Sequence, residues 1–259
     1  MRVALLVFLA CGRGKDPEPV GELTLVTYNL NFGNPDVEKT MAALASTNAD
    51  VALLQEVNAG WAALLKKRFE GSYRHLTFHP GAGGHAGHAV LSRFPFAADQ
   101  VLTKPDGAFY PGHRLVITTP TGRLQILHVH LRASIHDDCF EGPCTQIEWV
   151  KGQFSTPPIR KREIETHWKA VDPALPTIVA GDFNEPADGD VVAFLTARGL
   201  TRVATTGPTS WHHVQNGSEL LAETIDHVMI DHRITALEAK VVDAGASDHR
   251  PVIARLRLR

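Results

Sequence analysis

Short runs of apolar residues alternate with segments of helical spacing from residue 22 to the end of the chain. A continuous apolar run such as Val51-Ala52-Leu53-Leu54 is typical of a strand that is covered on both faces. Strands are predicted at residues 23–30, 51–54, 88–91, 115–118, 124–131, 177–180, 224–230, 240–242 and 252–256.

Helices are predicted between these strands, where apolar residues fall on one helical face. Asn34-Pro35 is typical of an N-cap followed by proline at the first helical position, and Gly199 is placed to end the last helix. The residues that mark the helices are Val37, Met41 and Leu44; Trp61, Leu64 and Leu65; Ile164, Trp168 and Val171; and residues 191–198.

The order of these elements predicts an α/β fold in which helices cover the outer faces of packed sheets. A doubly wound parallel fold would need regular βαβ units, and no helix is predicted across residues 86–131. No linker or repeat interrupts the chain after residue 21, so residues 22–259 are predicted to form one domain.

The first residues have a different character. Met1-Arg2 precedes an apolar run over residues 3–10, which is too short to span a bilayer and fits a signal peptide. The sequence before Cys11 resembles a lipoprotein cleavage box, although Phe8 and Leu9 depart from its usual residues. We therefore expect residues 1–21 to be a signal-like segment and linker. We expect the protein to be exported to the periplasm or cell surface, either anchored through an acylated Cys11 or secreted. The alternative is an apolar N-terminus without a targeting role.

Composition narrows the functional classes. Apolar residues make up 44% of the chain, enough for a large core. With 26 basic and 28 acidic residues the formal net charge is −2, which argues against a broadly basic nucleic-acid surface but leaves a local basic groove open. Cys139 and Cys144 are close enough for a local disulfide in an exported protein, and would be free thiols in a cytosolic one.

Polar side chains follow several of the predicted strands at the point where each strand ends. Glu56 follows residues 51–54, while Asp182 and Asn184 follow residues 177–180. Side chains alternate along a strand, so Asp182 and Asn184 are predicted to share a side. His128 and His130 share a side for the same reason.

Further polar groups follow near the C-terminus. Asp226 interrupts an apolar strand, and Asp248-His249 lies in the turn before the last strand. Burying these charges unpaired would be costly, so we expect all of these strand ends to converge on one site. Oxygen donors without a cluster of Cys or His favour Mg²⁺, or Mn²⁺, over zinc. A cation of this kind beside carboxylates and a histidine indicates phosphate-ester chemistry.

Seven segments in order resemble the endonuclease/exonuclease/phosphatase superfamily, which includes deoxyribonuclease I and neutral sphingomyelinases. The resemblance covers residues 22 to 257 and implies a four-layer α/β sandwich of two mixed sheets flanked by helices. The segments are TYNLN, LLQEV, AVLSRFP, HVHL, GDFNEP, TIDHVMI and SDHRPV.

The resemblance also implies a role for each residue. Glu56 corresponds to the principal metal ligand, with Asn29 as a further ligand or its partner and Asp248 facing the metal region. Asp182 corresponds to the carboxylate that positions or deprotonates water, and Asn184 to the carboxamide that orients the phosphate.

The remaining roles concern histidine and arginine. His249, held by Asp226, corresponds to the histidine that contacts the phosphate. His130 matches the histidine of the nuclease and sphingomyelinase branches, a candidate general acid. Arg114 and His88 are expected to bind substrate.

Some histidines depart from the family pattern. His88, His128 and His227 stand where Asn, a small residue or an aromatic is common, so they either widen the metal choice towards Mn²⁺ or Zn²⁺, bind phosphate, or simply line the site. Residues 133–160 form an insertion that is expected to shape the substrate mouth. Two further sets are predicted to be solvated: the loop histidines His75, His79 and His85, and the basic run Arg160-Lys161-Arg162.

The function expected from this pattern is Mg²⁺-dependent hydrolysis of phosphodiester bonds, in nucleic acid or in a phospholipid headgroup, by a monomer. One alternative is a phosphomonoesterase that acts on sugar or inositol phosphates. Another, of a different class, is a non-catalytic surface lipoprotein that uses the fold as a binding module. Ser247-Asp248-His249 is not a hydrolase triad, because adjacent residues in one turn cannot adopt the geometry of a triad.

Overall fold

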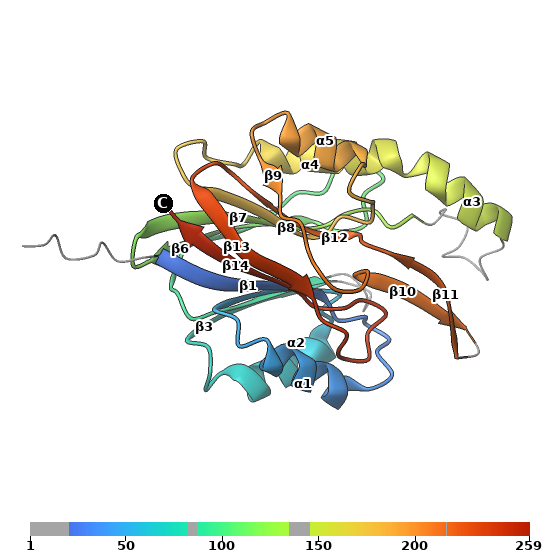
Figure 1. The fold of residues 1–259 in the computed structure, drawn as a ribbon, viewed down its shortest axis with the longest axis horizontal. Coiled ribbons are helices and arrows are strands. Elements are labelled where there is room, and N and C mark those ends of the chain that lie inside the picture. Colours follow the sequence, from blue (N-terminus) through green and yellow to red (C-terminus); the bar gives the residue numbers. More distant parts are fainter. Residues whose placement is uncertain (1–20, 82–86, 135–145, 216) are drawn as a thin grey trace, which may run out of the picture.

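Two six-stranded mixed sheets pack face to face in the computed structural model, which describes residues 21–81, 87–134, 146–215 and 217–259 (Figure 1). The β1–β2 and β7–β8 pairs are parallel and the other pairs are antiparallel. The first sheet contains, in spatial order, β13 (Ile234–Val241), β14 (Val252–Leu258), β1 (Gly21–Asn29), β2 (Val51–Gln55), β4 (Gly87–Ser92) and β3 (His75–Pro80). The second contains β5 (Phe96–Leu102), β6 (Gly112–Thr119), β7 (Gly122–His130), β8 (Thr177–Asp182), β12 (Asp226–Ile230) and β9 (Thr201–Arg202).

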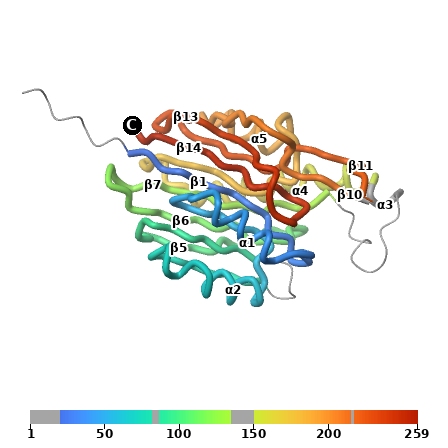
Figure 2. The backbone as a smooth tube through the Cα atoms, turned by 60° about the horizontal axis from the view of Figure 1, so that its bottom comes forward, coloured from blue at the N-terminus to red at the C-terminus, as the bar shows by residue number. Residues whose placement is uncertain are grey.

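Helices cover both outer faces, which confirms the predicted four-layer sandwich. Helices α1 (Val37–Ser46) and α2 (Ala59–Phe69) cover the first sheet, and α4 (Pro157–Trp168) and α5 (Asp190–Thr196) cover the second. Helix α3 (Gln146–Ser155) and a separate hairpin of β10 (Trp211–Gln215) and β11 (Ser218–Glu223) extend from the end of the sandwich opposite to the C-terminus (Figures 1 and 2). Among the helices in the described ranges, none is long and apolar enough to cross a membrane.

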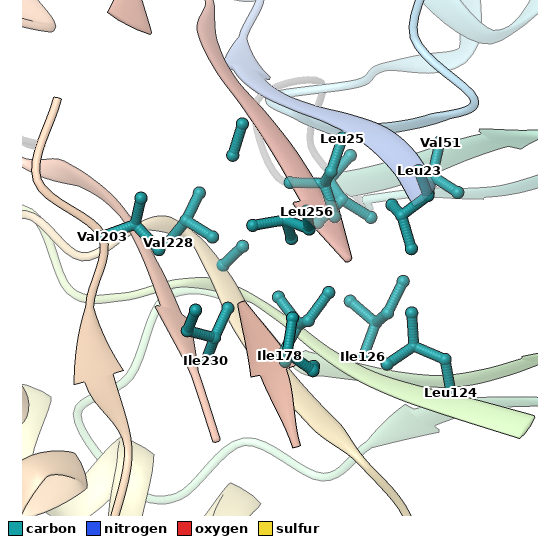
Figure 3. Close-up of a cluster of buried hydrophobic side chains, with 14 of the residues drawn as sticks. Leu23, Leu25, Val51, Leu124, Ile126, Ile178, Val203, Val228, Ile230 and Leu256 are labelled. Atoms are coloured by element: carbon teal, nitrogen blue, oxygen red, sulfur yellow. The ribbon is translucent and has the colours of Figure 1, made fainter. Parts of the chain in front are cut away.

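Three apolar clusters hold these layers together. The largest lies between the sheets and includes Leu25, Ile126 and Leu256 (Figure 3). The others join the first sheet to α1 and α2, and the second sheet to α4 and α5. Each fully buried Leu, Ile or Val contributes about 1.5–3 kcal/mol relative to an exposed one. Both faces of each sheet are therefore buried, which explains why the central strands have continuous apolar runs.

The start of α1 differs from the prediction. The N-cap is Asp36, whose Oδ1 accepts a hydrogen bond from the backbone N of Lys39 at 2.9 Å. Asn34, the predicted cap, instead donates its side-chain amide to Leu30 O and Thr40 Oγ1, so it ties the loop after β1 to the helix.

Several elements were not predicted. Strands β3, β5, β10 and β11 and helix α3 lack the long apolar runs or clear helical spacing of the central elements. The prediction of solvated loop histidines is wrong for His75 and His79, which lie half-buried within β3; His85 lies outside the described residues. Cys11, Cys139 and Cys144 also lie outside them, as do residues 1–20 and 135–145.

The layer between the sheets changes character along the strands. At one end of β7 it contains Leu124 and Ile126, and at the other end the same face of the strand presents His128 and His130. The same change occurs on β8, where Ile178 and Ala180 give way to Asp182. One end of the inter-sheet layer is therefore polar, and both sites described below lie there.

Candidate active site

A cavity of about 470 Å³ opens at the polar end of the inter-sheet layer. It brings together eight of the predicted site residues from strand ends and from the turn before β14. Six of them line the cavity directly: Glu56, His130, Asp182, Asn184, Asp248 and His249. The other two, Asn29 and Asp226, contact these lining residues. The rest of the lining is Tyr110, Ala133, Ser134, Gln153, Trp211, Leu221, Ala222, Glu223 and Ile225.

Asp182 lies at the centre of this arrangement, at the end of β8. Gly181, with φ of +147°, lets β8 approach β7 so closely that a Cβ here would lie 1.8 Å from the backbone O of Val129. This close pairing sets Asp182 opposite His130 in the strand register, with Oδ2 of Asp182 3.4 Å from Nε2 of His130.

His249 is held between two carboxylates. Its Nδ1 lies 2.9 Å from Oδ2 of Asp226, and its Nε2 lies 3.6 Å from Oδ2 of Asp182. Burial on its own lowers the pKa of His249, but the charges of Asp226 and Asp182 outweigh burial and raise that pKa well above its ordinary value. The ring is therefore an imidazolium at neutral pH, with Nε2–H directed away from Asp226.

The pKa of the Asp182 carboxyl is also raised, but here burial is the cause. Burial raises its pKa above the usual range, while His249⁺ and hydrogen bonds from the side chain of Asn29 and the backbone N of Asn184 oppose the rise. A carboxylate whose pKa is raised is a stronger base than an ordinary aspartate, which suits it to accept a proton from water.

Asn29 joins the two sides of the cavity. Its Nδ2 donates to Oε1 of Glu56 at 3.0 Å and to Oδ2 of Asp182 at 3.1 Å, and its Oδ1 accepts from the backbone N of Asn31. Glu56 also accepts from the backbone N of Phe32, and burial raises the pKa of its carboxyl. The carboxamide of Asn29 therefore fixes the separation of the two carboxylates.

Left-handed backbone recurs around the cavity. Glu56 has φ of +59°, Asn184 +52° and Asn31 +57°. This region is unfavourable for a residue with a side chain, particularly for glutamate, and it turns each side chain out of the regular strand direction. Strand β8 ends at Asp182, so Asn184 reaches the same cavity through this turn and not, as predicted, through strand alternation.

The turn that carries Asp248 and His249 is tied to the β10–β11 hairpin. Trp211 forms a β-bridge with His249, and its Nε1 donates to Oδ2 of Asp248 at 3.3 Å. Oδ1 of Asp248 accepts from Nδ2 of Asn31 at 2.8 Å. The hairpin thus orients the turn that carries Asp248 and His249, and forms one wall of the cavity through Leu221, Ala222 and Glu223.

His130 is buried and stacked on Tyr110, with ring centroids 3.7 Å apart. Burial lowers its pKa well below the ordinary histidine value, and the charge of His249 lowers it further. The ring is therefore neutral at pH 7 and does not carry the extra proton that the predicted general acid would deliver.

Two predicted substrate-binding residues do not reach the cavity. Arg114 lies on the helix-covered face of β6, where its Nε donates to Oε1 of Gln125 at 2.7 Å. His88 is buried between the sheets on β4, away from the lining residues. His227 also points away, because its Nε2 lies 2.9 Å from the backbone O of Glu185 and its ring packs on Phe183.

The prediction of a solvated basic run is wrong for Arg160. Its Nη1 donates to Arg132 O, Ser134 Oγ and Thr156 Oγ1, and its Nε lies 3.6 Å from Oε2 of Glu185. The guanidinium therefore supports the segment that carries Ser134 into the cavity wall. Lys161 and Arg162 are exposed, as predicted.

The sequence pattern did not identify Tyr110, Trp211 or Leu221 as part of the site. Tyr110 lies in the segment between β5 and β6, and the other two lie on the unpredicted hairpin. The one available signal was a cluster of aromatic residues, Phe109-Tyr110, beside a proline and glycine turn.

Comparison with known proteins identifies a matching family. The model of the endonuclease/exonuclease/phosphatase family matches residues 26–249. No curated protein matches the chain.

Solved structures show the same fold. An endonuclease/exonuclease/phosphatase from Beutenbergia cavernae is 19% identical, with a TM-score of 0.67, over 92% of this chain and 72% of that one. TDP2 of D. rerio, complexed with single-strand DNA product, is 15% identical, with a TM-score of 0.67, over 91% and 98%. Sphingomyelinase C from Streptomyces griseocarneus is 17% identical, with a TM-score of 0.63, over 90% and 99%.

Proposed function

The chain belongs to the endonuclease/exonuclease/phosphatase family, and on that premise we propose that it hydrolyses phosphodiester bonds with a divalent cation, Mg²⁺ or Mn²⁺. The observation that carries the proposal is the contact between Asp182 and His249, with Oδ2 and Nε2 3.6 Å apart, in an open cavity that the carboxylates of Glu56 and Asp248 also line. Family and fold make the chain a phosphoesterase; the cation and the substrate are the proposed part.

The donors of the cavity fit a hard cation. Glu56 and Asp248 present carboxylate oxygens to the cavity, and oxygen is the donor that Mg²⁺ prefers. Oδ1 of Asp226 is buried with no hydrogen-bond partner among the described residues, which leaves a further oxygen available. A divalent cation held by Glu56 and Asp248 would polarise the phosphate and stabilise charge on the leaving oxygen. Asn29, whose carboxamide is engaged in three hydrogen bonds, we assign to positioning the carboxylates and not to ligation.

The short distance between Asp182 and His249 restricts their roles. In an in-line displacement the attacking and leaving oxygens lie on opposite sides of phosphorus. Groups 3.6 Å apart cannot flank one phosphate, so both act on the attacking side. Asp182 accepts a proton from water as the new P–O bond forms. His249⁺ donates a hydrogen bond from Nε2 to a non-bridging oxygen, and Asp226 holds the ring through Nδ1.

Two further residues complete this arrangement. Asn184 donates one amide proton to Leu131 O and has a second for the phosphate. Neutral His130, whose Nε2 lies 3.4 Å from Oδ2 of Asp182, orients the base at that oxygen, while the backbone N of Asn184 donates to Oδ1. The bond to the leaving group breaks as the new bond forms, and the leaving oxygen takes its proton from solvent.

The described lining contains no lysine or arginine, and it includes the apolar side chains of Leu221, Ala222 and Ile225. A nucleic acid draws much of its affinity from phosphate contacts with basic residues. A substrate with an apolar part beside the phosphodiester, as in a phospholipid, therefore fits the described lining better. Nucleic acid remains the alternative substrate to test.

The test is release of nitrophenol from bis(p-nitrophenyl) phosphate by the purified full chain with Mg²⁺, Mn²⁺ or EDTA. We expect activity with either cation, loss in EDTA, and loss in Asp182→Asn. His232→Ala, an exposed histidine in the turn after β12, is the matched control. A wild type that is silent with every cation would favour the binding-module alternative. Parallel digestion of sphingomyelin vesicles and plasmid DNA then separates the two substrates.

We also propose export with acylation of Cys11, on the apolar run and cysteine described above. The test is incorporation of labelled fatty acid by a bacterial host that expresses the full chain, compared with Cys11→Ser. Equal labelling of both chains would contradict anchorage at this cysteine.

A further inference from the structure

A second group of polar side chains lies in the inter-sheet layer, beyond the cavity lining. His88 on β4 and His79 on β3 are paired in register, as are His113 on β6 and His128 on β7. Each pair faces the other sheet, because the same strand faces carry Val90, Leu115 and Ile126 of the inter-sheet core. The packing of the two sheets therefore brings histidines from four strands into the polar end of a layer whose other end is filled with apolar side chains.

Three of these histidines form a closed cluster: His88 is 2% exposed, and His113 and His128 are 0% exposed. One ring nitrogen from each lies within 4.8 Å of one from each of the others. The ring centroids of His88 and His128 are 4.3 Å apart, and His113 lies 6.1 Å from both.

Each of the three rings has a buried nitrogen without a hydrogen-bond partner among the described residues. These atoms are Nε2 of His88, Nδ1 of His113 and Nδ1 of His128. An unsatisfied buried polar group costs about 1–3 kcal/mol, so three in one place require an explanation. A ligand shared by the three rings would satisfy all of them.

The opposite nitrogens of two rings are already held. Nε2 of His113 lies 2.6 Å from Oδ1 of Asp99, which fixes the proton on Nε2 and leaves the lone pair on Nδ1. Nε2 of His128 lies 2.6 Å from Nε2 of Gln55, and Oε1 of Gln55 is buried without a partner among the described residues. Turning this amide over places Oε1 against Nε2 of His128, where it accepts the ring proton and leaves the lone pair on Nδ1. A histidine that ligates a metal ordinarily has its other nitrogen bonded to a carboxylate or carbonyl in this way.

We propose that His88, His113 and His128 bind a transition-metal ion, with Zn²⁺ the first candidate. Three imidazoles without a carboxylate among them suit zinc or its neighbours and not Mg²⁺. Zinc–nitrogen bonds of about 2.0–2.1 Å require the three nitrogens to lie about 3.4 Å apart, so the rings would move together on binding. Burial lowers the pKa of each of these histidines, which keeps them in the neutral form that ligates.

The residues around the trio suggest how the ion reaches it from solvent and what the ion does there. His79 and Asp99 are partly exposed, and Oδ1 of Asp99 contacts Nε2 of both His79 and His113, so they lead from solvent to the buried trio. The trio is closed to substrate and joins β4 of the first sheet to β6 and β7 of the second. The ion is therefore a structural link between the sheets, and the inference does not depend on the proposed phosphodiesterase activity.

The test begins with the wild-type full chain, loaded with Zn²⁺ and dialysed against a weak chelator. We expect about one zinc per chain by mass spectrometry, and X-ray absorption that shows three imidazoles at about 2.0–2.1 Å. This measurement needs no variant. A spectrum with one imidazole and several oxygens would assign the zinc to Asp182, Asp226 and His249 instead, and would overturn the proposal; so would the absence of retained metal.

Variants then test the assignment of the ligands. His88→Asn and His113→Gln should lose the retained zinc, while Glu56→Gln and the exposed control His232→Gln should keep it. Zinc should raise the melting temperature of the wild type by about 5 °C or more relative to EDTA, and that of His88→Asn by less than about 1 °C. Retention of zinc by both cluster variants would overturn the proposal.

Discussion

The cavity and the histidine cluster occupy the same polar end of the inter-sheet layer, but they consist of different kinds of side chain. The cavity presents carboxylates around one imidazolium, opens to solvent, and has left-handed backbone at Glu56 and Asn184. The cluster presents neutral imidazoles, is closed, and lies on regular paired strands. A shared position in the fold therefore does not fix a shared role. Donor type and access to solvent distinguish the proposed site of hydrolysis from the proposed structural metal site.

The sharpest test of this contrast is the loss of a catalytic group. Asp182→Asn removes the base and His249→Ala removes the imidazolium, so kcat on bis(p-nitrophenyl) phosphate should fall about 10³-fold or more in each. Circular dichroism should show that both variants are folded. A folded His113→Gln variant with an equally large loss of kcat would erase the distinction between the two regions.

The next test concerns the cation of the cavity. Glu56→Gln removes a charged oxygen ligand while keeping the hydrogen bond from Asn29, so the Mg²⁺ concentration for half-maximal activity should rise about tenfold or more. Glu238→Gln, an exposed glutamate on β13, is the matched control. An unchanged Mg²⁺ requirement in Glu56→Gln would remove this residue from the metal site.

The two regions should also respond to pH in opposite directions when the protein is free of metal. The folded pKa of His249 is raised, so its contribution to stability is present below about pH 6.5 and is lost as pH rises through the folded value. The pKa values of His88 and His128 are lowered, so their contribution is present above about pH 6.5 and is lost as pH falls.

Urea unfolding in EDTA between pH 5 and 9 measures this difference. Each proton that only one state binds gives a slope of about 1.4 kcal/mol per pH unit. Relative to wild type, His249→Gln should flatten the fall in unfolding free energy on the alkaline side, and His88→Asn the fall on the acid side. Parallel curves for the two variants would contradict the opposite charge states.

The smallest expected effect isolates the backbone of the cavity. At Glu56, with φ of +59°, glycine should be more stable than alanine by about 1–2 kcal/mol in the free energy of unfolding. At Glu238, within a strand, the order should reverse by about 0.5–1 kcal/mol. Equal stabilities of Glu56→Gly and Glu56→Ala would show that the left-handed turn carries no strain.

Much of the cavity could be predicted from the sequence because Glu56, Asp182 and Asp226 stand at the ends of apolar strands. A charge in that position has no place in a core, and the ends of strands from the two packed sheets meet at the same end of the sandwich. The central strands and the layer order followed from the same apolar runs, and the family pattern added roles that strand position alone does not supply.

The errors have a common physical origin. Strand β6 is covered on both faces, so its apolar residues do not reveal that Arg114 faces the helices while His113 faces the other sheet. The burial of Arg160 depends on its contacts with Glu185 and Thr156. The histidine cluster depends on how the two sheets are placed relative to each other when they pack. Contacts of this kind are set by tertiary packing and leave no local pattern in the sequence.

The β10–β11 hairpin has a consequence for how this chain can diversify. Its base is fixed by Trp211, but its outer part, with Leu220 and Val214 exposed, belongs to neither six-stranded sheet. Insertions or exchanges in that ribbon leave Asp182 and its neighbours undisturbed. Evolution or protein engineering can therefore change which substrates the cavity admits by altering the outer part of this hairpin. Asp182 and its neighbours then stay as they are.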